Sequence, residues 1–211
     1  MSTQPPEASR YTWLLRRPAP WAALISAIVL VVVLVTRPGQ SAPEALGTLP
    51  TYSFTSEQGV PFGTEELTGR VYVANFIFTR CPTICPRFSE KMARIQSALA
   101  DQRGIHLVSF SVDPEFDTPE VLREYSERYR ADPTRWTFLT GDYEQLRETV
   151  VGGFKIAMGN EAPEEDDVMS IFHGEHFVIV DQRGEIRGYV HANEEDVVEQ
   201  VSALALRLRD A

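Results

Sequence analysis

The two cysteines of the chain, Cys81 and Cys85, have three residues between them and lie where a predicted strand passes into a predicted helix. Residues 71–78 form a mostly β-branched and aromatic run, which is typical of a strand buried on both faces. If the helix begins near Pro82, Cys81 lies at its N-terminus and Cys85 one turn later, on the same face. A helix N-terminus favours negative charge and lowers the pKa of a thiol, which prepares both sulfurs for a metal ion or for redox exchange.

Soft thiolates of this kind select copper(I), zinc or an iron–sulfur centre. Two cysteines cannot complete a closed zinc site or a cluster, because each of these takes four ligands, whereas two thiolates and one imidazole suit copper(I). Among the four histidines, His106 lies inside a predicted strand and His191 at a strand end, which indicates structural or surface roles. His173 and His176 lie at the start of a predicted hairpin, and either could complete the site.

The same two thiols could instead form a disulfide. A structural bridge that closes so short a loop would add little stability, but a reversible bridge would make the protein a thiol–disulfide oxidoreductase. Dedicated oxidoreductases of this kind have two residues between their cysteines, and the three found here favour metal binding. A peroxidase is a third possibility, because such proteins share the scaffold, but Thr79 and Pro82 only partly match the residues expected around a peroxidatic cysteine, which disfavours it.

The order of the predicted elements indicates an α/β fold. Strands and helices alternate through the first half of the domain, and a hairpin and a final helix follow, as in a thioredoxin-like fold with a central mixed sheet and helices on both faces. In that fold the loop before the hairpin lies beside the cysteine turn. The predicted strands are 71–78, 105–112, 135–139, 152–158, 172–180 (interrupted early by Gly174) and 185–190, after a small hairpin at 52–62. Helices are expected after Cys85, after Thr118, at 142–151 and at 194–208.

The N-terminal region predicts a membrane anchor. Residues 19–36 carry no charge and are mostly aliphatic, and about 17–20 such residues cross a bilayer. Three arginines precede this segment and Arg37 alone follows closely, which places the N-terminus in the cytoplasm. A cleaved signal peptide is the alternative, but its apolar region would be shorter. We expect a cytoplasmic segment at 1–18, an anchor at 19–36, a linker at 37–48 and the domain at 49–211.

Composition restricts the partners. A formal net charge of −10 argues against nucleic acid, whose phosphates would be repelled. The acidic stretch 160–167 lacks the ligand spacing and turn glycine of a calcium loop, so we expect it to be a solvated loop.

Two motifs resemble a known family. Residues 76–86, FIFTRCPTICP, resemble the F-x-[FY]-T-x-C-P-x-x-C-P signature of the Sco (SenC/PrrC) family, and residues 111–119, SVDPEFDTP, resemble its SVDP-E-x-DTP segment. The copper histidine of that family lies eight residues before the Asp-x-x-Gly turn of the hairpin, and counting back from Asp181 gives His173. The resemblance extends from Tyr52 to the C-terminus.

The resemblance implies a membrane-tethered copper protein of the thioredoxin-like fold. Members of the family deliver copper to, or reduce the cysteines of, the dinuclear copper centre in cytochrome c oxidase subunit II. By that match Cys81, Cys85 and His173 are the expected ligands of Cu(I) or Cu(II), and Asp113 is expected to support the metal or modulate its redox chemistry. The family reserves no ligand role for His176.

The expected function is therefore that of a copper metallochaperone rather than an enzyme, with cytochrome c oxidase subunit II or another copper-accepting protein as partner. The alternative is a thiol–disulfide oxidoreductase that acts on the cysteines of that subunit, with Cys81 and Cys85 as its redox-active residues. The short N-terminus lacks a long Arg- and Ser-rich presequence, which favours a bacterial inner membrane with the domain in the periplasm over a mitochondrial inner membrane.

Overall fold

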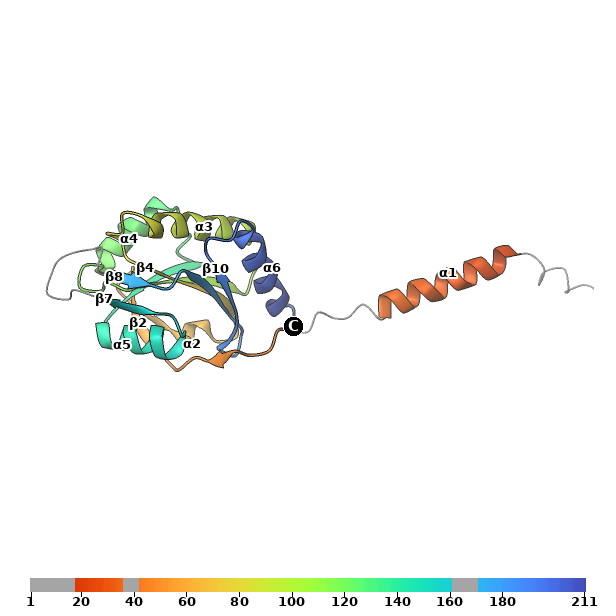
Figure 1. The fold of residues 1–211 in the computed structure, drawn as a ribbon, viewed down its shortest axis with the longest axis horizontal. Helices are drawn as coiled ribbons and strands as arrows, with labels where there is room; N and C mark the ends of the chain where they lie inside the picture. Colours follow the sequence, from red (N-terminus) through yellow and green to blue (C-terminus); the bar gives the residue numbers. More distant parts are fainter. Residues whose placement is uncertain (1–17, 36–41, 161–170) are drawn as a thin grey trace, which may run out of the picture. The chain divides into compact units, whose positions relative to one another are not determined.

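A computed structural model of the chain describes residues 18–35, 42–160 and 171–211. The chain divides into two compact units, Met1–Ser41 and Ala42–Ala211. The described part of the first unit is a single helix, α1 (Pro18–Val35), shown in orange in Figure 1. Within the described ranges no helix is long and apolar enough to cross a membrane, so the anchor expected at 19–36 is not confirmed. The expected cytoplasmic segment and the acidic stretch lie almost entirely outside the described residues.

The second unit is built on a mixed sheet in the order β1-β10-β9-β4-β5-β6-β2-β3. Its centre consists of three parallel strands that are buried along their whole length, because their apolar side chains face helices on both sides. Antiparallel strands extend the sheet at both edges. The strands are β1 (Gly47–Thr48), β2 (Ser53–Ser56), β3 (Pro61–Gly63), β4 (Val71–Ile77), β5 (Ile105–Ser111), β6 (Trp136–Thr140), β9 (His176–Val180) and β10 (Glu185–His191).

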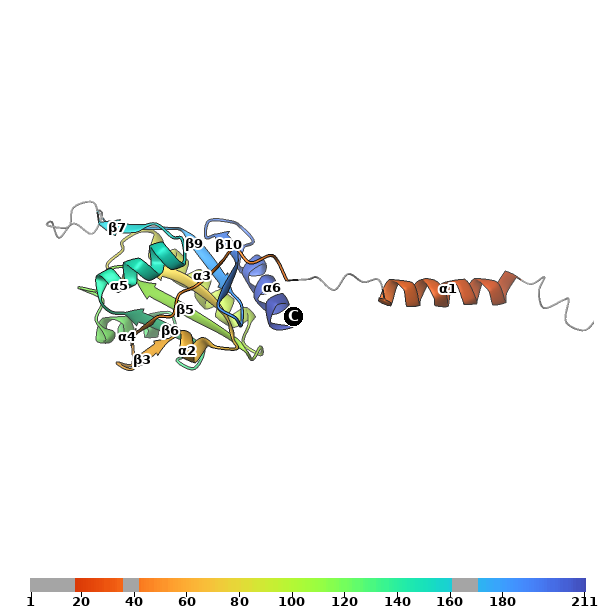
Figure 2. The ribbon, with the colours of Figure 1, turned by 90° about the horizontal axis from the view of Figure 1, so that it is seen from below.

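Helices cover both faces of this sheet. Figure 1 shows on one side α3 (Ile84–Ala98), α4 (Pro119–Arg128) and α6 (Val197–Arg209). A short helix that continues into a π-helical turn lies on the other side, from which Figure 2 views the unit. A further helix of a single turn joins the first hairpin to β4. These three elements are α5 (Tyr143–Arg147), η3 (Glu148–Gly153) and α2 (Thr64–Leu67). The mixed α/β architecture predicted from the sequence is confirmed.

Side-chain contacts agree with this division into faces. The hydroxyl groups of Ser89 in α3 and Tyr125 in α4 lie 2.8 Å apart. On the opposite face lies Phe154, which follows η3. Its ring centroid is 5.4 Å from that of Phe76 and 5.1 Å from that of Phe110. The cysteine-bearing helix and the aromatic core around Phe154 are therefore separated by the sheet.

Two local expectations differ from the structure. The helix predicted at 142–151 continues after Arg147 as the π-helical turn, which the Phe154 N–H closes by donating to the Thr149 carbonyl. The strand predicted at 152–158 is wrong, because only Met158–Asn160 (β7) is extended.

The interruption predicted at Gly174 in the strand 172–180 is confirmed. Ile171–His173 (β8) pairs with β7 in a separate two-stranded sheet, and β9 belongs to the main sheet. Gly174 lies at the break, where an added Cβ would approach the Ile156 side chain to 2.8 Å.

Residues 42–48, expected to end a linker, lie along the domain. Gly47 pairs with Ile186 of β10, and the Leu46 N–H donates to the carbonyl of the same residue. The Arg187 Nη1 donates to the Pro43 carbonyl at 2.7 Å. The ordered domain thus begins several residues before position 49.

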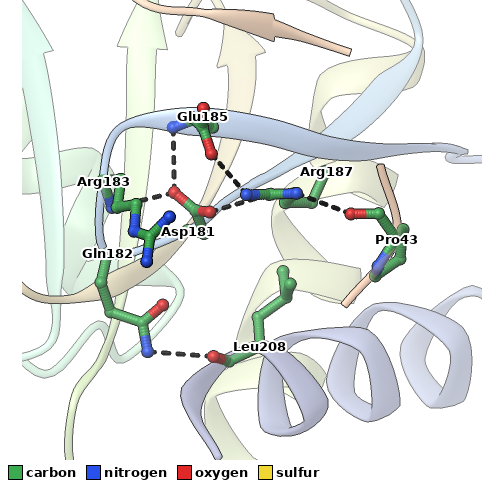
Figure 3. A network of polar contacts seen from close by, with 7 residues as sticks. All are labelled: Pro43, Asp181, Gln182, Arg183, Glu185, Arg187 and Leu208. Carbon is green, nitrogen blue, oxygen red and sulfur yellow. Dashed lines mark hydrogen bonds and ion pairs between the residues drawn. The ribbon is translucent and has the colours of Figure 1, made fainter. Parts of the chain in front are cut away.

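Residues 42–48 are held in place by a polar network around the buried Asp181 carboxylate in the β9–β10 turn (Figure 3). Its Oδ1 accepts the backbone N–H groups of Arg183 and Glu185 at 2.9 and 3.0 Å. Its Oδ2 accepts from the Arg187 Nε at 2.7 Å, and Arg187 also forms an ion pair with the Glu185 side chain. Arg187 therefore neutralises the buried carboxylate and holds Pro43 at the same time.

Replacement of Arg187 by alanine is expected to lower the free energy of unfolding by about 2–4 kcal/mol, because it leaves the Asp181 carboxylate buried without its cation. Urea unfolding of the full chain measures the change. Arg183→Ala is the matched control, because Asp181 bonds to the backbone and not the side chain of Arg183, and it should change stability by less than about 0.5 kcal/mol. Equal effects of the two substitutions would contradict this account of the network.

Candidate metal centre

Cys81 lies in the turn after β4, and Cys85 lies in the first turn of α3. The helix begins at Ile84, two residues later than expected, and the side chain of its N-cap residue Thr83 makes no capping hydrogen bond. The Cys81 Sγ instead accepts the Cys85 backbone N–H at 3.5 Å. The sulfur of Cys81 thus satisfies one of the N–H groups that a helix leaves free at its start.

The Cys85 thiol lies against the imidazole of His173. Its Sγ is 3.3 Å from the His173 Nε2, and these two side chains are 0% and 8% exposed. The His173 Nδ1–H donates to the Gly174 carbonyl at 3.2 Å, which leaves the lone pair of Nε2 directed at the sulfur. Burial lowers the pKa of His173, so the ring is neutral at pH 7 and able to bind a metal ion.

The two thiols differ in acidity. A hydrogen bond from the Cys85 thiol, assisted by nearby backbone N–H groups, lowers the pKa of Cys81 to about 4. The same hydrogen bond, together with burial, raises the pKa of Cys85. In the reduced protein Cys81 is therefore the thiolate and Cys85 the protonated partner, and neither is in a disulfide.

These three side chains do not yet form a closed ligand shell. Across the described ranges no group of three or more His, Cys, Asp or Glu side chains is close enough to hold a metal ion as it stands. Cys85 nevertheless contacts both of the other candidates, His173 through its sulfur and Cys81 through its amide. Cys85 therefore lies between the other two candidates.

Asp113 lies beside the cysteine turn, but its partner is Arg80. The Arg80 Nε donates to the Asp113 Oδ2 at 2.9 Å, and the same guanidinium lies 4.6 Å from the centre of the exposed Phe116 ring. Because Arg80 immediately precedes Cys81, Asp113 acts on the turn through this ion pair.

Asp117 is a residue that the sequence analysis missed as part of the site. Its carboxylate is 0% exposed and accepts three kinds of hydrogen bond: from the Thr79 N–H at 3.2 Å, from the Thr79 hydroxyl at 2.5 Å and from the Ser111 hydroxyl at 2.6 Å. Burial raises the pKa of Asp117 to about 6. The sequence signal that points to Asp117 is its place in the second motif, directly before the Thr118 and Pro119 that start α4.

The other histidines lie away from the thiols. His106 is buried, bonds through Nε2 to the Thr137 hydroxyl at 2.9 Å, and has a pKa lowered to about 4 by burial, in agreement with a structural role. No contact in the described part of the chain joins His176 to either cysteine, so of the two hairpin histidines the structure brings His173 to the site.

We expect the metal-free, reduced protein to keep one thiolate down to about pH 4, measured by absorbance at 240 nm. In Cys85→Ala the midpoint should rise toward the usual value of 9, because the thiol donor to Cys81 is lost. Cys85→Ser is the matched control, since its hydroxyl retains a donor and should keep much of the shift. A wild-type midpoint near 9 would contradict the assignment of Cys81 as the thiolate.

Asp117 should make stability depend on pH. Its folded-state pKa of about 6 exceeds the usual 3.8, so its contribution is complete below about pH 4 and is lost as the pH rises through 6. Relative to Asp117→Asn, the wild type should lose up to about 3 kcal/mol between pH 4 and pH 8, measured by urea unfolding. The exposed Asp101→Asn serves as control and should retain the wild-type pH dependence. Parallel curves for wild type and Asp117→Asn would refute the assignment.

Comparison with known proteins gives a consistent result. A family model described as SCO1/SenC matches residues 40–206. A protein of Stutzerimonas stutzeri, named provisionally as copper-binding, is 32% identical over 149 residues, which cover 68% of this chain and 69% of that protein. The crystal structure of a SCO1/SenC family lipoprotein from Bacillus anthracis is 30% identical, with a TM-score of 0.72 over 80% of this chain and 99% of the other.

A second solved structure is that of BsSco, described as a member of the Sco family of cytochrome c oxidase assembly proteins with a disulfide switch. It is 30% identical, with a TM-score of 0.65 over 79% of this chain and 99% of the other. The residues that the family model matches include both cysteines and His173. The chain belongs to the SCO1/SenC family.

Proposed function

We propose that this protein binds copper through Cys81, Cys85 and His173 and passes it to a copper-accepting protein during assembly of cytochrome c oxidase. The observation that carries the proposal is the 3.3 Å contact between the Cys85 Sγ and the His173 Nε2, which joins residues 88 positions apart in the sequence. Copper is in this view a cargo that the protein takes up and releases.

The donor set suits copper(I). Thiolate ligands select soft ions and imidazole suits copper, so the three side chains complement one another. Cys81 is already ionised at neutral pH and His173 is already neutral, so only Cys85 has to release a proton when the ion binds. Phe78 and Phe88 lie edge-on to the His173 ring and limit the access of water.

The relatives support the direction of this proposal. One is named for copper binding, and BsSco belongs to a family of cytochrome c oxidase assembly proteins. The acceptor that we propose is the dinuclear copper centre of cytochrome c oxidase subunit II. We further propose that residues 19–36 anchor the chain in a bacterial inner membrane with the domain in the periplasm; the support is the uncharged sequence of this segment and the arginines before it.

A second candidate function is reduction of a disulfide in the acceptor. The unequal thiols favour it, because Cys81 supplies an attacking thiolate and Cys85 a thiol that can resolve the mixed disulfide. In that reaction the two thiols become one disulfide and give two electrons and two protons to the acceptor, whose disulfide becomes two thiols. Copper delivery and this reduction can be successive steps of one assembly process.

The test is the copper(I) affinity of the reduced full chain, measured by competition with a chromophoric chelator. The wild type should bind one copper(I) ion per chain. Cys81→Ala, Cys85→Ala and His173→Ala should each weaken binding by more than the roughly 10–100-fold caused by loss of an outer partner of a metal site. His176→Ala is the matched control and should bind as the wild type does.

Undiminished copper affinity in His173→Ala would refute the ligand assignment. Absence of copper binding in the wild type, with a disulfide that forms and is reduced readily, would favour the thiol reductase instead.

A further inference from the structure

A second group of metal-binding side chains lies on the β9–β10 hairpin. His176 and His191 are direct partners in the antiparallel register, and their ring centroids are 4.9 Å apart at an interplanar angle of 80°. Side chains of directly opposed residues on neighbouring antiparallel strands are close enough to interact, and so to contact the same ion. The His191 side chain is 43% exposed, so an ion from solvent can reach the pair.

Glu175 supplies a carboxylate at the same place. Its Oε2 lies 3.8 Å from the His191 Nε2 and accepts the Asn193 Nδ2 at 2.8 Å, and its carbonyl accepts the Ala192 N–H at 2.8 Å. Both the side chain and the backbone of Glu175 are therefore held against the end of β10.

This group is separate from the cysteine centre. Phe177 packs its ring 6.3 Å from that of Phe88 in α3, so the alternation of side chains directs its neighbour His176 to the opposite face. On that face the Tyr189 ring lies 6.4 Å from His176, and the Tyr189 hydroxyl bonds to the Phe154 carbonyl. The sheet lies between the two sets of ligands.

We propose that His176 and His191, assisted by Glu175 and water, bind a divalent transition-metal ion, with Cu²⁺ preferred. Imidazole and carboxylate without sulfur suit borderline divalent ions, and among these Cu²⁺ binds such ligands most strongly. The cysteine centre, by contrast, selects soft ions through its thiolates.

The geometry indicates moderate affinity. In the described ranges no three such side chains are already arranged around an ion, so the imidazoles and the Glu175 carboxylate have to rearrange to enclose one. The His191 Nδ1 accepts the Asn193 N–H at 3.1 Å, which leaves the ring proton on Nε2. Coordination through Nε2 moves that proton to Nδ1 and gives up this hydrogen bond.

The test uses the full chain with Cys81→Ser and Cys85→Ser, titrated with Cu²⁺ alone and followed by electron paramagnetic resonance and calorimetry. One Cu²⁺ per chain is expected, with nitrogen hyperfine structure from two imidazoles. Adding His176→Gln or His191→Gln should weaken binding more than tenfold, equivalent to about 1.4 kcal/mol. The matched control His173→Gln, in the same background, should leave binding unchanged.

Absence of Cu²⁺ binding would overturn the proposal, as would binding that persists in both His176→Gln and His191→Gln or is lost in His173→Gln. Far-UV circular dichroism shows whether each variant is folded. The copper(I) test of the preceding section uses intact cysteines, so failure of one site is distinguishable from failure of the other.

Discussion

The antiparallel pairing of β9 with β4 is the interaction on which the candidate centre depends. Tyr72 pairs with Val180 and Ala74 with Val178, so the start of β9 lies toward the carboxyl end of β4, where the cysteine turn begins. His173, just before β9, is therefore brought to the Cys85 sulfur although 88 positions separate the two residues. A shift of this register by one residue would turn every side chain of β9 to the other face and separate the ligands.

The turn that carries the cysteines is stabilised by a small group of buried polar side chains in an otherwise apolar interior. Thr79 and Ser111 both donate to Asp117, which links the ends of β4 and β5. Burial of a carboxylate is unfavourable unless hydrogen bonds satisfy it, and here they do. The same bonds fix the backbone just before Cys81, so the geometry of the turn does not depend on a bound ion.

Much of this arrangement could be predicted from the sequence, because its signals are local. The apolar run of β4, the Thr118–Pro119 start of α4 and the Gly184 turn each determine their own element. The alternation of strands and helices then gave the α/β architecture, and the spacing of Cys81 and Cys85 placed both sulfurs at one helix start. Residue types alone left His173 and His176 as equal candidates, and only the family resemblance and the fold distinguish them.

What could not be predicted depends on contacts between distant segments. The π-helical turn after Arg147, the pairing of Gly47 with Ile186 and the burial of Asp117 have no local pattern. The histidine pair on the hairpin is of the same kind, because His176 and His191 become neighbours only through the register of β9 with β10.

The unequal ionisation of the two thiols has a consequence for the charge of the centre. With Cys81 ionised and Cys85 protonated, the empty pair carries one negative charge. If copper(I) enters as the Cys85 proton leaves, one monovalent cation replaces another and the net charge is still −1. The buried surroundings, with Asp117 among them, then face the same net charge with and without the ion. In the proposed function, uptake and release would therefore exchange one monovalent cation for another at constant net charge.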